Sequence, residues 1–273
     1  MPGRGPNLHP VNTPLGRFGV ETLIDSPDPF VATMPVGRLV NPLTGATTLG
    51  PVAVLVDYVA GLVNHHRRAD DEWTVSSELT MDLTPDAVDV IARNPDLPVV
   101  GTAHPFGGKG ATSLGICELT HGDLVIGTGS VRSVHIARPA VFTDPHDQRP
   151  TDEGPRPTDL AEIMAVRAGA DGPRAVMFQA ASSSLNNDLG IVHGGVASAG
   201  LELVASAALN AGRDEPLQTA SLRVNFLRQL LCGTDSRYVG TAFRVGRRSG
   251  VADAQAIGAD GGVALSARVT AYR

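Results

Sequence analysis

The sequence predicts an α+β fold in which one structural unit occurs twice. Two long apolar segments, residues 51–63 and 193–209, are each long enough for a helix and apolar on nearly every side. This pattern is typical of buried helices. Each segment is followed by a stretch of alternating character and then by further strands joined at a short glycine turn. A buried helix with a run of antiparallel strands, present twice, predicts two packed units that together imitate a dimer.

The predicted strands follow the same order in both halves. The strand after each helix alternates between apolar and polar residues, and a glycine turn suited to a tight hairpin joins the last two strands. The first half also contains a predicted surface helix at 85–93. The predicted strands cover residues 73–83, 125–136, 217–227 and 263–271, with turns at 121–123 and 260–262.

A proline-rich, charged stretch near the middle divides the chain. Between residues 138 and 160 proline recurs and no apolar period survives, which predicts a linker. We therefore expect an N-terminal extension over residues 1–33, with one short strand near 20–24. A first unit over residues 34–137 and a second unit over 161–273 complete the expected organisation.

Composition excludes several classes of protein. A hydrophobic content of 42% supports a packed core, and a net charge of −6 disfavours a nucleic-acid partner. The N-terminal residues do not resemble a signal peptide, and no apolar run predicts a membrane span, so we expect a cytoplasmic protein. Cys117 and Cys232 lack any CxxC or Cys/His spacing, so neither a disulfide nor a metal is expected.

Two acidic residues stand out within the apolar helices. Asp57 lies in the middle of the first, and Glu202 occupies the matching position in the second. Burial of an ionised carboxylate is costly unless it is paired, so the repetition favours function over packing. The alternative is a structural carboxylate held by backbone amides or an arginine.

A glycine turn precedes the second helix. His193-Gly194-Gly195 stands directly before it, and Asn186-Asn187-Asp188 lies just upstream. A helix N-terminus presents unpaired N–H groups, and glycine lets a ligand oxygen approach them. The turn is therefore a candidate site for a polarised carbonyl and the oxyanion that develops from it. The alternative is that the glycines only let the helix pack against the sheet.

The spacing of these residues resembles that of the hotdog thioesterases of the phenylacetic-acid-pathway type and their tandem relatives. Asn187 lies six residues before His193, and Glu202 lies nine residues after it, as in that family. Residues 222–228 and Gly246-Arg247-Arg248 resemble the strand segments that follow. The first half matches less well, with Asp57 and Gly50 in place. Thr48 and Leu49 stand at the positions of the His and the first Gly, and the upstream Asn41 lies one residue too far away.

The resemblance implies two hotdog domains in tandem, each an antiparallel sheet wrapped around a long central helix. It also implies hydrolysis of acyl-CoA thioesters, with coenzyme A as part of the substrate and no other cofactor. In the family, each site combines the loop of one hotdog with the acid of its neighbour. One complete site would therefore join Asn187, His193 and Gly194 to Asp57.

The other site would join Glu202 to Asn41, Thr48 and Gly50, which lack the histidine. Ser206, one turn after Glu202, keeps a hydroxyl where the first helix has Gly61. We therefore expect one competent and one degraded site in each chain.

The resemblance also assigns roles at the preferred site. The Gly194 N–H would polarise the thioester carbonyl, while Asp57 would activate water or attack directly. Asn187 would orient water or substrate, and His193 would brace the loop or contact the thioester. The residues expected to contact coenzyme A are Gly195, Arg228, Arg247 and Arg248.

Two other functions fit the same fold. A hotdog hydratase or dehydratase would use Asp188 and His193, whereas a non-catalytic acyl-CoA-binding protein would retain the substrate without turnover. The resemblance also implies a homo-oligomer, a dimer of double hotdogs, but no residue in the sequence indicates the length of the acyl chain.

Two further motifs have structural interpretations. Residues 107–112 resemble a phosphate loop but lack Ser or Thr after Lys109, so a glycine-rich hairpin is expected. His65 and His66 near the end of the first helix are expected to act as cations at its C-terminus.

Overall fold

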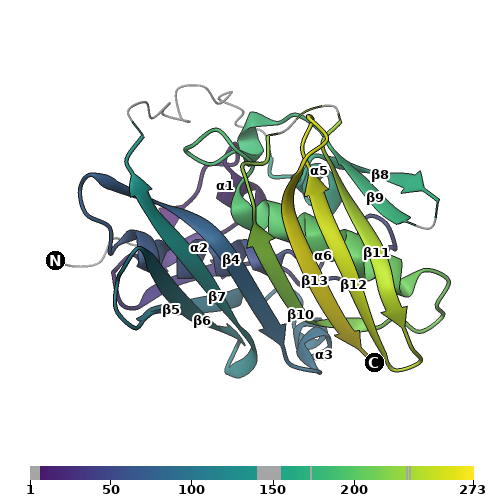
Figure 1. The fold of residues 1–273 in the computed structure, drawn as a ribbon. Helices are drawn as coiled ribbons and strands as arrows, with labels where there is room; N and C mark the ends of the chain where they lie inside the picture. Colours follow the sequence, from purple (N-terminus) through teal and green to yellow (C-terminus); the bar gives the residue numbers. More distant parts are fainter. Residues whose placement is uncertain (1–6, 140–154, 173, 232, 234) are drawn as a thin grey trace.

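The computed structural model describes residues 7–139, 155–172, 174–231, 233 and 235–273. Most of the predicted linker, and Cys232, lie outside these residues. In the described part, thirteen strands form one antiparallel sheet that curves around two long helices, α2 (Val52–His65) and α6 (Gly194–Asn210) (Figure 1). Both helices were predicted from their apolar runs, and their positions are confirmed.

The strand order shows the duplication. On each side of the centre, six strands follow one pattern: the two strands before the long helix lie at one side of the unit, and the strand after the helix lies at the other. In the first unit the order is β2 (Glu21–Ile24), β3 (Phe30–Met34), β5 (Val99–Phe106), β6 (Thr112–His121), β7 (Leu124–Ala137) and β4 (Glu72–Leu83). In the second unit it is β8 (Val166–Asp171), β9 (Arg174–Gln179), β11 (Arg237–Val245), β12 (Ser249–Ile257), β13 (Val263–Tyr272) and β10 (Gln218–Phe226).

The first unit includes strands that precede residue 34. The short strand expected near residues 20–24 is confirmed as β2, and β1 (Asn7–Leu8) pairs with it. The sequence did not reveal β3, whose five residues are all buried and which pairs with β5. Pro29 and Pro35 flank this strand. Because prolines indicate turns, the short apolar run between them did not predict a strand.

The shorter helices pack at the margins. The predicted surface helix is present as α3 (Ala87–Arg93), although Ala87, Val90 and Ile91 on one side of it are buried. Two equivalent one-turn helices, α1 (Pro14–Phe18) and α5 (Leu160–Ile163), precede β2 and β8. The glycine-rich segment 107–111 joins β5 to β6, which confirms the hairpin.

The two units meet where β4 pairs with β10. Thr80 lies opposite Arg223 at the middle of this antiparallel pair, so an approximate two-fold axis passes between them. Each strand carries a β-bulge at the equivalent place, between Ser76 and Glu78 in β4 and between Thr219 and Ser221 in β10. A bulge redirects the side chains beside it, and both bulges lie next to a helical carboxylate.

Glycines allow the helices to lie close to each other and to the sheet. A Cβ added at Gly195 would lie 2.6 Å from Cα of Val54, so α6 begins in contact with the backbone of α2. A Cβ at Gly240 would lie 2.1 Å from the carbonyl oxygen of Val204, where α6 crosses β11. Backbone atoms cannot yield as a side chain can. The Gly195 contact therefore brings the Asp57 region of α2 against the start of α6, and the Gly240 contact holds α6 against the sheet.

Candidate functional site

Three elements from the two units meet at Asp57. Its side chain lies on α2 and is only 8% exposed. The Gly195 N–H, at the start of α6, donates to Oδ2 over 2.7 Å. The Ser76 hydroxyl, at the β4 bulge, donates to Oδ1 over 3.0 Å. Both carboxylate oxygens therefore have a donor, which offsets part of the cost of burial.

His193 caps α6 beside this carboxylate. Its Nδ1 accepts the Gly195 N–H over 3.1 Å and lies 3.5 Å from Oδ2 of Asp57. Burial lowers the pKa of His193 below its usual range, although Asp57 and Asp188 act in the opposite direction. The ring is therefore uncharged at neutral pH, with its proton on Nε2 because Nδ1 is an acceptor.

Gly194 is the first residue of α6 and faces the carboxylate. A Cβ at this position would lie 2.9 Å from Oδ2 of Asp57 and 3.0 Å from the ring of Phe226, so only glycine fits without displacement. Within the described residues, the Gly194 N–H has no hydrogen-bond acceptor. It is a free donor at the positive end of a seventeen-residue helix.

A cavity of about 620 Å³ opens over Asp57 and Gly194. One side of it is formed by α2, β4 and β7 of the first unit, and the other by the loop before α6 and the end of β10 in the second unit. Its size is in the range of small-molecule sites. The groups that bind a ligand here would therefore come from both halves of the chain.

Asn187 lies in the wall of this cavity and holds its own loop. Its Oδ1 accepts the N–H of Leu189 over 3.0 Å and that of Ile191 over 3.4 Å. The carbonyl side of the amide is therefore engaged in the turn that leads to His193. The expected orientation of water or substrate stays a prediction, and only the NH₂ group remains for it.

The predicted arginines occupy different places. Arg228 lies at the rim of the cavity, where its guanidinium pairs with both oxygens of Asp260 at 2.6 and 2.9 Å. This pairing holds the pKa of Asp260 at about 2.

The structure does not bring Arg247 and Arg248 to this cavity. They lie in the turn between β11 and β12, where Ser249 pairs with Tyr272 at the far end of β13 from cavity residue Leu265. Seven residues of strand span about 23 Å. A phosphate contact from these two side chains at this site is therefore not supported.

The equivalent carboxylate in the second unit is closed in. Glu202 is 1% exposed and accepts hydrogen bonds from the hydroxyls of Thr219 and Thr48, the latter over 3.3 Å. Thr48 in turn accepts the Gly50 N–H over 3.1 Å. A Cβ at Gly50 would lie 2.1 Å from Oε2 of Glu202. The Glu202 side chain, which is longer than that of Asp57, therefore reaches the loop that contains Gly50.

Little space is left around Glu202. The adjoining cavity has a volume of about 20 Å³, and Ser206 lies in its wall. Asn41 is buried and holds the loop to α6 by donating to the carbonyl oxygen of Leu203 over 2.9 Å. Burial raises the pKa of Glu202 above its usual range, against the opposing hydrogen bonds from Thr219 and Thr48.

Comparisons with known proteins bear on the fold and on one segment of the sequence. The family model described as Thioesterase superfamily matches residues 189–265, the segment that contains His193, Gly194 and Glu202. The tesB protein of Mycobacterium avium subspecies paratuberculosis is similar in structure, with a TM-score of 0.60 at 11% identity over 92% of this chain and 94% of that one. The chain has a tandem hotdog fold.

Two further structures support the fold of this tandem hotdog protein. A provisionally named thioesterase from Novosphingobium aromaticivorans has a TM-score of 0.62 at 10% identity, covering 92% of this chain and 97% of that one. A conserved protein of unknown function with a hotdog fold from Alicyclobacillus acidocaldarius has a TM-score of 0.56 at 16% identity, covering 92% and 94%. No curated protein sequence matches the chain.

Sequence reasoning missed the hydroxyl groups that hold the two hotdog carboxylates. Ser76 and Thr219 occupy equivalent bulges, and each donates to the acid of its own unit. The signal was present, because a hydroxyl residue stands at the matching place in the strand after each helix. The bulges themselves, which aim these groups at the acids, leave no clear mark in the sequence.

The expected role of the histidines at the end of α2 is wrong for His65. Burial is the main cause that lowers the pKa of His65 to about 4, and the nearby Arg68, His66 and His135 act in the same direction. It is therefore uncharged at neutral pH and cannot act as a cation at the helix C-terminus.

Two features are absent from the described part of the chain. No three His, Cys, Asp or Glu side chains there are grouped so that they could hold a metal ion. No helix among these residues combines the length and the apolar character needed to cross a bilayer.

The buried Glu202 predicts a pH-dependent difference in stability. Because the pKa of Glu202 is raised on folding, the folded chain binds a proton that the unfolded chain releases as the pH rises above 4.5. The contribution of protonated Glu202 to the free energy of unfolding is therefore fully present below pH 4.5. It declines as the pH rises through the raised pKa of Glu202 in the folded chain. Urea unfolding of the wild type and Glu202→Gln between pH 4 and 8 measures this, because glutamine does not titrate.

We expect the stability of the wild type, relative to Glu202→Gln, to fall as the pH rises. A constant difference across this range would contradict the account of Glu202 as a buried acid with a raised pKa.

Proposed function

We propose that this chain hydrolyses acyl-CoA thioesters at the site formed by Asp57 and Gly194. One observation carries the proposal. A cavity of about 620 Å³ brings together a buried, hydrogen-bonded carboxylate and a free helix N-terminal N–H, each from a different unit. The match of residues 189–265 to the thioesterase superfamily model supports the choice of a thioester as substrate.

The Gly194 N–H supplies the electrophilic side of the reaction. A thioester carbonyl oxygen placed on this donor is polarised by the N–H and by the positive end of α6. The same donor stabilises the negative charge that develops on oxygen when the carbonyl carbon is attacked. The absence of a side chain at Gly194 leaves room for this oxygen close to Asp57.

Asp57 supplies the nucleophilic side. As a general base it takes a proton from water while the water oxygen bonds to the carbonyl carbon. The tetrahedral intermediate then collapses, the carbon–sulfur bond breaks, and the thiolate of coenzyme A receives the proton. Direct attack by the carboxylate would instead give an anhydride that water opens, with the same products.

Hydrogen bonds position the carboxylate for either route. The Gly195 N–H and the Ser76 hydroxyl fix the plane of the Asp57 carboxylate, and uncharged His193 caps the helix that carries the oxyanion donor. Asn187 braces the loop before His193 through its Oδ1. These residues act by holding Asp57 and Gly194 in place.

The closed geometry at Glu202 favours one site per chain. Its carboxylate is engaged by Thr48 and Thr219, and the space beside it is too small for a thioester. A hydratase would instead rely on Asp188 and His193. Because Nδ1 of His193 faces Gly195 and Asp57, this geometry favours hydrolysis.

Removal of the proposed base tests the function. Purified protein is mixed with acetyl-, octanoyl-, palmitoyl- and phenylacetyl-CoA, and release of free thiol is followed. We expect Asp57→Asn to lower kcat by about 100-fold or more, the usual range for loss of a general base. Glu202→Gln, the matched change at the closed site, should retain most of the activity.

Loss of activity in Glu202→Gln alone would move the reaction to the second site. A folded wild type that binds acyl-CoA without releasing thiol from any substrate would instead indicate a binding protein. Hydration of an enoyl-CoA without thiol release would indicate a hydratase.

The two bulge hydroxyls offer a second, matched test. Ser76→Ala removes a hydrogen bond to the proposed base, and a bond to a charged group contributes about 1.5–3 kcal/mol. We expect kcat to fall by about 10- to 100-fold with KM little changed, because the substrate contacts remain. Thr219→Ala, the equivalent change beside Glu202, should leave kcat near that of the wild type, and an equal loss in both variants would contradict a single site.

A further inference from the structure

The residues that line the cavity lie on two sides of Asp57 and Gly194. Toward the second unit its rim carries exposed residues, including Leu227, Arg228 and Gln229. Toward the C-terminal end of α2 it runs between α2, β4 and β7, where its walls are half-buried. We call this part the inner limb, and its walls include Gly61, Leu62, His65, Trp73, Thr74, Val134 and Ile136.

Resting on the thioesterase function proposed above, we infer that the inner limb is an acyl-chain site of limited depth. We propose that it accepts an unbranched acyl group of medium length. Gly61 keeps the limb open, and His65 with Trp73 forms the wall at its end. The exposed rim on the other side leaves the coenzyme A part of the substrate toward solvent.

The length of the limb follows from α2. Asp57, Gly61 and His65 lie at intervals of four residues on one face of the helix, and all three line the cavity. Eight residues of helix span about 12 Å. With carbon–carbon bonds of about 1.5 Å, an extended chain advances roughly 1.3 Å per carbon, so about nine carbons reach from Asp57 to His65.

Gly61 is the position where a side chain would shorten the limb. A Cβ added there would meet no atom within 4 Å. Glycine inside a helix is less favourable than alanine by about 1 kcal/mol, so its presence in the middle of α2 has a cost in stability. At the equivalent place in the second helix stands Ser206, beside the closed cavity of about 20 Å³.

The end wall is aromatic and uncharged. The rings of His65 and Trp73 meet edge to face with centroids 4.5 Å apart, and Nδ1 of His65 is hydrogen-bonded to the Thr74 hydroxyl at 2.8 Å. The pKa of His65 is lowered to about 4, chiefly by burial, so the ring is uncharged at neutral pH. An apolar chain end can pack against such a wall without removing a charge from water.

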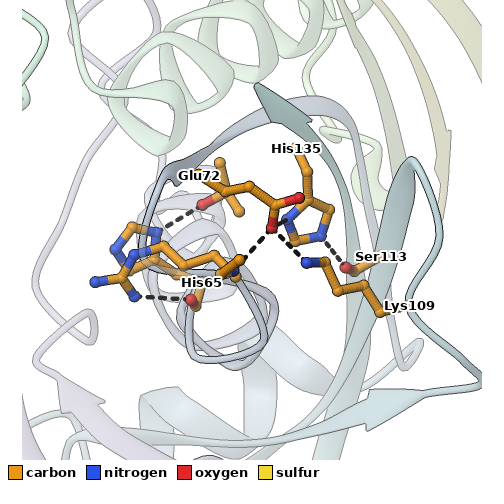
Figure 2. Close-up of polar contacts among 8 residues, drawn as sticks. His65, Glu72, Lys109, Ser113 and His135 are labelled. Atoms are coloured by element: carbon orange, nitrogen blue, oxygen red, sulfur yellow. Dashed lines mark hydrogen bonds and ion pairs between the residues drawn. The ribbon is translucent and has the colours of Figure 1, made fainter. Parts of the chain in front are cut away.

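A polar cluster behind the wall fixes it in place (Figure 2). Glu72, the residue before Trp73, accepts the Ala69 N–H over 2.8 Å and forms an ion pair with Lys109, and Nδ1 of His135 lies 3.4 Å from its carboxylate. His135 is hydrogen-bonded in turn to Ser113. These contacts tie the start of β4 to the β5–β6 hairpin and to β7, so the wall cannot easily move aside for a longer chain.

Acyl-chain length tests the inference. The kcat/KM for thiol release is measured with acetyl-, butyryl-, octanoyl-, decanoyl- and palmitoyl-CoA for the wild type, Gly61→Leu and Gly108→Leu. Gly108 lies in the exposed β5–β6 hairpin, where an added Cβ also meets nothing within 4 Å, so it is the matched control.

For the wild type we expect an optimum at octanoyl or decanoyl and a fall at palmitoyl. Gly61→Leu should lose at least about tenfold with octanoyl-CoA and shift the optimum to shorter chains, because a few methylenes in a pocket decide factors of this size. Gly108→Leu should keep the wild-type profile. An equal loss at every length in Gly61→Leu, or an unchanged optimum, would overturn the inference.

Binding separates this inference from the proposed function. Calorimetry with non-hydrolysable S-alkyl-CoA thioethers of the same lengths measures the limb without any reaction. If no thiol is released but affinity peaks at medium length and the peak shifts in Gly61→Leu, the acyl-chain site stands and the hydrolase proposal fails. If affinity does not depend on length, the acyl-chain site is excluded whatever the rate of hydrolysis.

Discussion

The hydrogen bond from the Gly195 N–H to the Asp57 carboxylate, 2.7 Å long, joins the two halves of the chain at a buried point. A carboxylate in the middle of an apolar helix needs donors, and here the main one comes from the other unit. The donor can reach it because Gly195 lets α6 begin against the backbone of α2. The same approach leaves the neighbouring Gly194 N–H facing the cavity. The position of the site thus follows from how a buried acid is satisfied.

The two halves satisfy the same requirement with different results. At Asp57 the shorter side chain stops at the helix N-terminus, and about 620 Å³ of space remains. At Glu202 one more methylene carries the carboxylate to the opposite loop, where Thr48 replaces the histidine and completes a closed set of hydrogen bonds. Burial then favours the protonated acid, which suits a structural role better than proton abstraction from water. A small difference in side-chain length therefore separates an open site from a packed core.

Much of this architecture was predictable from the sequence. The apolar runs located α2 and α6, and the repeated order of strands indicated the duplication, because burial imposes these patterns directly. Asp57 and the His193-Gly194 turn could be identified because an acid in an apolar helix and glycines at a helix start are both unusual. The crossing of these elements between units came from the resemblance to hotdog thioesterases rather than from any local pattern.

The rest depends on features that a sequence does not display. β3 lies between prolines and has only five residues, so its burial depends on pairing with β5, far along the chain. Ser76 reaches Asp57 only because of a bulge, and the uncharged state of His65 follows from burial in the folded chain. Arg247 and Arg248 were plausible as phosphate ligands until the register of β12 with β13 placed them at the far end of the strand.

The claim that each chain has one open site is tested most directly by counting ligands. Calorimetric titration of the wild-type protein with a non-hydrolysable S-octyl-CoA thioether gives the number bound per chain. The account predicts one per chain, because only the Asp57 side has space for it. Two equivalent ligands per chain would show that the Glu202 side opens, and would contradict the division into one competent and one closed site.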